Sequence, residues 1–178
     1  SPMPEESNIL TGTVDSVVYQ NGENGYTVLR LDTGEEEPVT VVGCIPGVAP
    51  GETLTARGSW THHPSYGPQF KAEVARRSIP VEVKAIFDYL ASGVVKGVGM
   101  STARKLVEEF GEDALNVLEH HPEKLTAIKG ITQKRAQSMG EAFRLQMSMR
   151  RLLDFLTEHG LDPQLGMPLY RRFGDLAL

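Results

Sequence analysis

Two glycines one residue apart, Gly97 and Gly99, stand before a run with helical spacing in the stretch VVKGVGMSTARKLVEEFG. Backbone amides at the start of a helix bind phosphate, so glycines at this place indicate a phosphate site. Lys96, Arg104 and Lys105 would add positive charge beside those amides. The phosphate can belong to a nucleotide cofactor or to a nucleic acid, and the neighbouring sequence decides between the two.

A dinucleotide-binding fingerprint, G-x-G-x-x-G, requires a preceding strand and a third glycine. Here Thr102 occupies the third glycine position, and the preceding segment, VEVKAIFDYLASG, has helical spacing. A phosphate loop of the form G-x-x-x-x-G-K-[ST] is absent from the sequence. We therefore predict that the printed sequence is not an enzyme on its own and binds no cofactor.

The glycine motif occurs three times, with copies that begin at Gly97, Gly130 and Gly160. Each copy reads glycine, an apolar residue, a small or capping residue, three variable residues, Ala or Gly, two more residues and an apolar residue. The first glycine permits a tight turn at positive φ, and the third position starts a helix whose first amides have no partner within it. A small residue such as Ala103 or Ala136 lets the two helices approach closely.

Two helices joined in this way make a helix–hairpin–helix motif, typical of proteins that contact the DNA backbone and read no bases. The predicted DNA-binding residues of the first two copies are Lys96, Gly97, Val98, Gly99, Ser101, Thr102, Arg104, Lys105, Lys129, Gly130, Ile131, Thr132, Lys134 and Arg135. The alternative is a tight helical turn with solvated charges, since Glu108 and Glu109 would oppose a phosphate. The third copy, which contains Pro168, is expected to be structural.

Residues 8–79 have the alternating pattern of strands in five segments, joined by turns rich in Gly, Pro and Asn. The predicted fold is α+β: a five-stranded OB-like β-barrel followed by an all-α tandem helix–hairpin–helix domain, although an SH3-like barrel gives the same pattern. Helical spacing starts at Pro80 and includes EDALNVLEHHPEKLTAIKG as one helical stretch. We expect residues 1–7 to be disordered or tag-like, and the helical domain, 80–178, to end within a repeat.

Aromatic residues of the barrel allow two interpretations. Trp60, Tyr66, Phe70 and Lys71, together with Tyr26, can form a surface for single-stranded DNA or for a protein partner. Alternatively, Tyr26 and Phe70 belong to the core and Trp60 covers the mouth of the barrel. The first 80 residues contain ten acidic and five basic residues, which favours the second interpretation.

The whole chain of 178 residues has a net charge of −5, so any contact with DNA depends on the local placement of Lys and Arg. One cysteine, Cys44, excludes an internal disulfide and fits a cytoplasmic location. No apolar stretch is long enough for a membrane helix, and the paired histidines at 62–63 and 120–121 do not share a face, so no metal site is predicted. Arg150 and Arg151 are expected to be exposed on a packed amphipathic helix.

The two halves together resemble the N-terminal region of RecD-like DNA helicases, of the long type that works without RecB and RecC partners. The resemblance rests on GTVDSVVYQNGENGYTVLRL, VVGCIPGVAPGETLTARGSW, HHPSYGPQFKAE, IFDYLASGVVKGVGMSTARKLVEEFG and LTAIKGITQKRA, in that order. It implies a superfamily 1 helicase that moves 5′→3′ on single-stranded DNA in repair or recombination. ATP and Mg²⁺ would be bound by motor domains beyond Leu178.

For the residues printed here, the resemblance implies an accessory region that binds single-stranded or forked DNA without sequence preference. The competing hypothesis is a regulatory module that docks on the helicase motor, on single-strand-binding protein or on another repair factor. The acidic barrel half favours this alternative.

Overall fold

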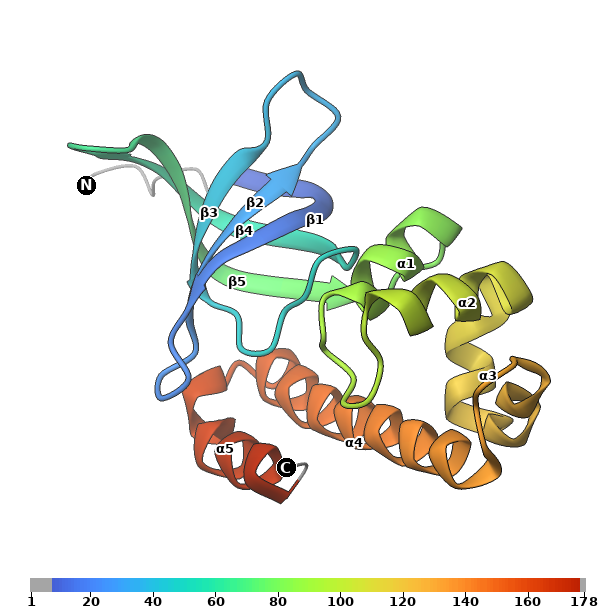
Figure 1. Cartoon of the computed structure of the whole chain (residues 1–178). Coiled ribbons are helices and arrows are strands. Elements are labelled where there is room, and N and C mark those ends of the chain that lie inside the picture. Colours follow the sequence, from blue (N-terminus) through green and yellow to red (C-terminus); the bar gives the residue numbers. More distant parts are fainter. Residues whose placement is uncertain (1–7, 177–178) are drawn as a thin grey trace, which may run out of the picture.

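The computed structural model describes residues 8–176; the predicted tag-like segment 1–7 lies outside this range. A five-stranded barrel comes first along the chain and a group of helices follows, as Figure 1 shows. This order confirms the predicted fold class at the level of a barrel followed by helices. The strands are β1 (Asn8–Gln20), β2 (Tyr26–Asp32), β3 (Val39–Cys44), β4 (Thr53–His63) and β5 (Gly67–Ser78).

The barrel is closed in the strand order β1-β2-β3-β5-β4, and β1 pairs with both β2 and β4. All pairs are antiparallel except β3 with β5. Alternation along β2 places Leu29 and Leu31 inside, both fully buried, and turns Arg30 between them outward. A Cβ atom at Gly58 would lie 1.9 Å from the carbonyl oxygen of Lys71, so only glycine fits where the register of β4 and β5 shifts.

The helical part surrounds a core of its own, in which Leu106, Leu118, Leu125, Met139 and Phe143 are buried. Its α-helices are α1 (Val83–Ala91), α2 (Met100–Phe110), α3 (Ala114–His120), α4 (Gln133–Glu158) and α5 (Met167–Leu176). Three short 3₁₀ helices connect them: η1 (Gly111–Asp113), η2 (Pro122–Ala127) and η3 (Pro163–Gly166). Between residues 8 and 176, no helix is both long and apolar enough to cross a membrane.

The helical stretch predicted at residues 112–130 is divided in the structure. α3 ends at His120, and η2 begins at Pro122. Proline lacks an amide hydrogen and disfavours helical geometry in the residue before it, which explains the break.

A buried ion-pair network joins the barrel to α4. Glu52, in the loop before β4, is fully buried and accepts a hydrogen bond from the guanidinium of Arg150. Its second carboxylate oxygen accepts from the amide of Ala49 at 2.5 Å, and the Nε atom of Arg77 lies 3.6 Å from the first. The prediction that Arg150 is exposed was therefore wrong: its side chain turns toward the barrel because the charge of Glu52 lies there.

Candidate nucleic-acid interface

Two turns in the helical part have the same backbone geometry. Each consists of an apolar residue, a lysine, a glycine and a second apolar residue, in the segments Val95–Val98 and Ile128–Ile131. In both, the carbonyl oxygen of the first residue accepts from the amide of the fourth at 3.1 Å. The glycines have φ angles of 89° and 93°, as the sequence predicted. The apolar ends are buried, which leaves the lysine exposed at the tip of each turn.

The N-cap residue of the helix after each turn lies two residues beyond the glycine. α2 has Gly99 as its N-cap residue, with no side-chain cap, and the amides of its first turn find no acceptor among the described residues. α4 has Thr132 as its N-cap residue, and the Oγ1 atom of Thr132 accepts from the amide of Arg135 at 3.2 Å. The first copy therefore presents more free N–H groups to a ligand than the second.

Contacts between the copies bring the two turns together. The Nε2 atom of Gln146 donates to the carbonyl oxygen of Val94 at 2.6 Å, which holds the first turn on α4. The Nη2 atom of Arg135 donates to the Oγ1 atom of Thr102 at 2.9 Å and links the starts of α4 and α2. A hollow of about 400 Å³ lies beside these contacts, with Lys96 in its lining.

Six basic side chains surround the two turns, and all are exposed. None of them has a carboxylate within the 4.0 Å of an ion pair anywhere in the part of the chain that the structure describes. Because no carboxylate pairs with them, these surface cations are available to the phosphates of a polyanion. The six are Lys96, Arg104, Lys105, Lys129, Lys134 and Arg135.

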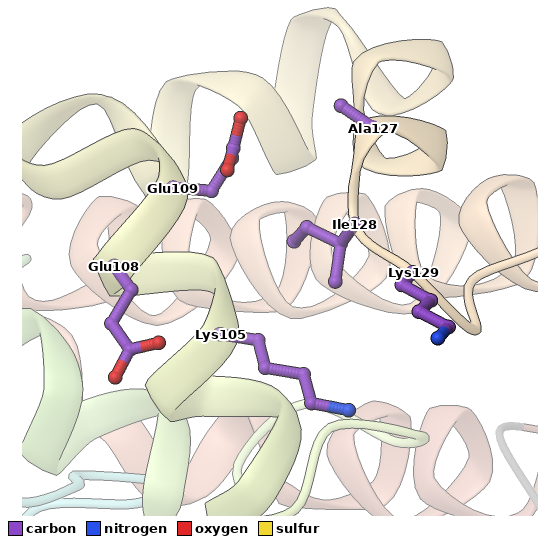
Figure 2. A pocket seen from close by; sticks show the side chains of 6 residues that line it. All are labelled: Lys105, Glu108, Glu109, Ala127, Ile128 and Lys129. Carbon is purple, nitrogen blue, oxygen red and sulfur yellow. The ribbon is translucent and has the colours of Figure 1, made fainter.

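Two of these lysines line the same hollow, of about 540 Å³, between α2 and the turn before α4. Figure 2 shows the ammonium groups of Lys105 and Lys129 at the same end of this hollow. The carboxylates of Glu108 and Glu109 also line it, and Figure 2 shows them on the other side of it from the two ammonium groups. A phosphate that approaches from the lysine end meets positive charge first.

The third copy has a different geometry from the first two. Gly160 has a positive φ of 68°, but Leu161 is 45% exposed where the other copies bury their apolar residue. The amide of Leu161 donates to the carbonyl oxygen of Leu156 at 2.8 Å, which makes this turn a cap of α4. Pro168 lies in the first turn of α5, where an amide has no partner within the helix, so it does not break that helix.

Of the four barrel residues predicted as a surface, one lies in the core and three are exposed. Phe70 is fully buried in the barrel core, so its assignment to a surface was wrong. The ring of Trp60 is half exposed and meets Phe70 edge to face, with the ring centroids 5.4 Å apart. Tyr66 and Lys71 are exposed. Tyr26 is 43% exposed, so its alternative assignment to the core was also wrong.

A groove of about 540 Å³ crosses the outer face of the barrel instead. β1, β2, β3 and the hairpin of β4 and β5 all contribute to it. Its lining residues are Val18, Tyr19, Tyr26, Val28, Arg30, Thr40, His63, Tyr66 and Gln69. Sequence analysis missed Tyr19, Arg30 and His63 as members of this surface. The alternation of β2 is a signal for part of it, because a strand that turns Leu29 inward must turn its neighbours outward.

Comparison with known proteins identifies the class of the barrel. Residues 7–80 match the family model described as "ATP-dependent DNA helicase YrrC, OB-fold domain". The closed barrel is therefore an OB-fold, and the SH3-like alternative is excluded.

One curated relative matches nearly the whole chain. The ATP-dependent RecD2 DNA helicase of Deinococcus radiodurans is 29% identical over 183 aligned positions, which cover 99% of this chain. The chain spans about a quarter of that relative's length, 25%. The two comparisons confirm the resemblance of this chain to the N-terminal region of RecD-like DNA helicases.

Among solved structures, the Stn1–Ten1 complex of S. pombe matches at 16% identity, over 43% of this chain and 60% of the matched chain, with a TM-score of 0.35. A TM-score of this size supports no inference about function.

Proposed function

We propose that these residues form an accessory DNA-binding region of an ATP-dependent DNA helicase and grip the sugar-phosphate backbone through tandem helix–hairpin–helix elements. The observation that carries the proposal is the pair of matching turns. Each turn has a lysine at its tip and is followed by the N-terminus of a helix. Amides at a helix start and unpaired lysines are both donors to phosphate oxygens. Neither kind of contact distinguishes one base from another, so binding has no sequence preference.

Contact with DNA depends on the local cluster of six cations, because the chain as a whole is negative. At 0.1 M salt, exposed charges are screened beyond about 10 Å, so a distant carboxylate has little effect on a phosphate at the turns. In the parent helicase, motor domains would bind ATP and Mg²⁺ and move 5′→3′ during repair or recombination in the cytoplasm. The region described here would hold single-stranded or forked DNA for that motor.

The test is the triple substitution Lys96→Ala, Arg104→Ala and Lys105→Ala. Affinity for labelled single-stranded, duplex and forked oligonucleotides is measured by fluorescence anisotropy at low and moderate salt. Each lost phosphate contact removes roughly 0.7–0.9 from the slope of log affinity against log salt, so the slope should fall by roughly 2–3.

A control removes the same charge elsewhere, with Arg57→Ala, Arg76→Ala and Lys84→Ala, which are exposed residues of β4, β5 and α1. The control should retain most of the affinity. Unaltered affinity of the first variant for DNA, or an equal loss of affinity in the control, would contradict the proposal that the two turns bind DNA.

A protein-docking module is the second candidate, and the exposed acidic turn at residues 35–37 favours it. Such a module would bind the helicase motor, single-strand-binding protein or another repair factor. Phosphate contacts are strongest at low salt, so absence of DNA binding there would favour docking over the grip on DNA.

A further inference from the structure

We infer that the third copy of the glycine motif is one half of a hairpin pair, and that its partner is a fourth copy beyond Leu178 in the parent helicase. The inference rests on the proposed function only in taking the chain to continue as a helicase. It is carried by the pairing of the first two copies, by three exposed leucines of the third copy, and by a repeat in the sequence.

The first two copies contact each other through equivalent positions. Thr102 stands five residues after the glycine of copy one, and Arg135 stands five residues after the glycine of copy two. The Nη2 atom of Arg135 donates to the Oγ1 atom of Thr102 at 2.9 Å. Equivalent residues meet at the axis of an isologous interface, in which two like units face each other about a two-fold axis. The first two copies therefore form an approximately symmetric pair, with this contact near its axis.

The apolar positions of the motif are buried in that pair. These positions, one and nine residues after the glycine, are at most 7% exposed, and their four residues belong to one core: Val98, Leu106, Ile131 and Met139. A Cβ atom built at Gly97 would have the side chain of Met139 as its neighbour, at 3.7 Å. The turn of copy one therefore packs on the helix of copy two, and each copy contributes to the burial of the other.

The third copy exposes leucines at the same three positions. Leu161, Leu165 and Leu169 stand one, five and nine residues after Gly160. They are 45%, 62% and 48% exposed. Met167, which lies between them in sequence, is 2% exposed, so α5 is covered on another side. Exposed apolar residues at every position through which the other copies pair indicate a hairpin without its partner.

The first two copies do not supply that partner. In Figure 1, α5 lies below the barrel beside the C-terminal half of α4, and α2 and α3 lie toward the other end of α4. Copies one and two are already paired with each other, so the leucines of copy three need a different cover.

The sequence indicates what this cover is. The ten residues from Leu106, LVEEFGEDAL, resemble the ten from Leu169, LYRRFGDLAL, with leucine, phenylalanine, glycine, alanine and leucine in the same places. After copy one this stretch leads to copy two, and the copies begin about 30 residues apart. The same arrangement after copy three predicts a fourth copy that begins about 30 residues after Gly160, beyond Leu178. The chain spans 25% of the length of the RecD2 relative, so a parent of that size has room for it.

The experiment locates the partner by photo-crosslinking in the parent helicase. Leu165 is replaced by p-benzoylphenylalanine, the protein is irradiated, and mass spectrometry locates the adduct. Adducts are expected within one repeat, about 30 residues, after Leu178. Adducts in the motor domains, adducts between two copies of the protein, or no adducts beyond those of the control would overturn the inference. The control carries the same replacement at Arg76, an exposed residue of β5.

A second readout compares hydrogen exchange in the parent and in the chain of 178 residues. Amides of residues 163–172 should exchange at least about tenfold more slowly in the parent, because a bound partner opposes local opening. The triple variant Leu161→Gln, Leu165→Gln and Leu169→Gln should abolish this difference, and Gln164→Ala, an exposed residue of the same segment, should retain it. Equal exchange of these amides in the two wild-type proteins would contradict the pair.

The two proposals fail separately. The Lys96, Arg104 and Lys105 triple variant tests the grip on DNA and should leave the adducts of position 165 unaltered. Unaltered duplex affinity of that variant contradicts the grip on DNA alone, and an adduct outside the expected segment contradicts the hairpin pair alone.

Discussion

Tyr89 of α1 lies where the barrel meets the helices and is 1% exposed. Burial raises the pKa of its hydroxyl to about 12, and the charge of Glu52 acts in the same direction. The guanidinium groups of Arg150 and Arg77 oppose this rise. A tyrosinate at this position would be desolvated, so the folded state retains the proton that an unfolded chain loses near pH 10.

Stability should therefore fall between pH 10 and pH 12, because the unfolded chain releases a proton there that the folded chain keeps. Each pKa unit corresponds to 1.36 kcal/mol, so Tyr89 accounts for roughly 2 kcal/mol of the fall in unfolding free energy by pH 11.5. Below pH 10 Tyr89 causes no fall, because the tyrosine is protonated in both states. Tyr89→Phe should make the decline shallower by that amount in urea unfolding at pH 9 and pH 11.5. Tyr66→Phe, on an exposed ring, is the control, and an equal effect there would contradict the role of burial.

Residue types alone predicted the cations of the turns but not the environment of single side chains. Phe70 and Tyr26 are both aromatic residues of strands, and only their register places one inside the barrel and the other outside. Arg150 lies on an amphipathic helix, where exposure is the ordinary expectation. Its burial depends on Glu52, which is 98 residues away in sequence, and no local pattern contains that information.

At the scale of elements, the two matching turns differ in one residue that matters for DNA. The N-cap position of α2 is a glycine. The same position of α4 is a threonine whose hydroxyl oxygen accepts a hydrogen bond from a backbone amide. Gly99 has a φ of −97°, and no atom lies within 4 Å of a Cβ built there. A side chain at this position is therefore tolerated without strain.

Gly99→Ser should stabilise the protein and weaken its grip on DNA. The serine hydroxyl would accept from an amide of the first turn of α2, which raises the free energy of unfolding by a few tenths of a kcal/mol. The same bond competes with a phosphate for that amide, so duplex affinity should fall a few-fold in anisotropy measurements. Gly99→Ala adds a Cβ without a hydroxyl, and a loss of affinity as large as that of the serine variant would refute the competition.

The turns could be predicted from sequence because their requirements are local. A glycine at positive φ, a buried apolar neighbour and a small residue in the next helix occupy fixed positions within ten residues. The barrel groove could not be predicted in the same way. Its lining comes from β1, β2, β3 and the hairpin of β4 and β5, and these residues meet only after the barrel has closed.

The molecule as a whole depends on the ion-pair network of Glu52, Arg77 and Arg150. Removing one partner of a buried pair leaves a buried charge uncompensated and costs about 3–5 kcal/mol. Arg150→Met leaves Glu52 with Arg77, whose Nε atom lies 3.6 Å away, so the free energy of unfolding should fall by up to that amount. Glu52→Gln takes the carboxylate away from both arginines and should therefore lower the free energy of unfolding by more than Arg150→Met does.

Urea unfolding followed by two probes measures this effect and the coupling of the two parts. Trp60, the one tryptophan of the chain, reports on the barrel, and circular dichroism at 222 nm reports on the helices. The two transitions should coincide in the wild type and separate in Arg150→Met. Coincident transitions in the variant would show that the network does not couple barrel and helices.

The distance along the chain between Glu52 and Arg150 has a consequence for synthesis. The barrel leaves the ribosome first, and the partner of its buried carboxylate follows 98 residues later. At about 5–20 residues per second, the nascent barrel spends roughly 5–20 s with Arg77 as the only arginine beside Glu52. The barrel therefore gains the buried guanidinium of Arg150, the donor to its buried carboxylate, only when the nascent chain has delivered α4.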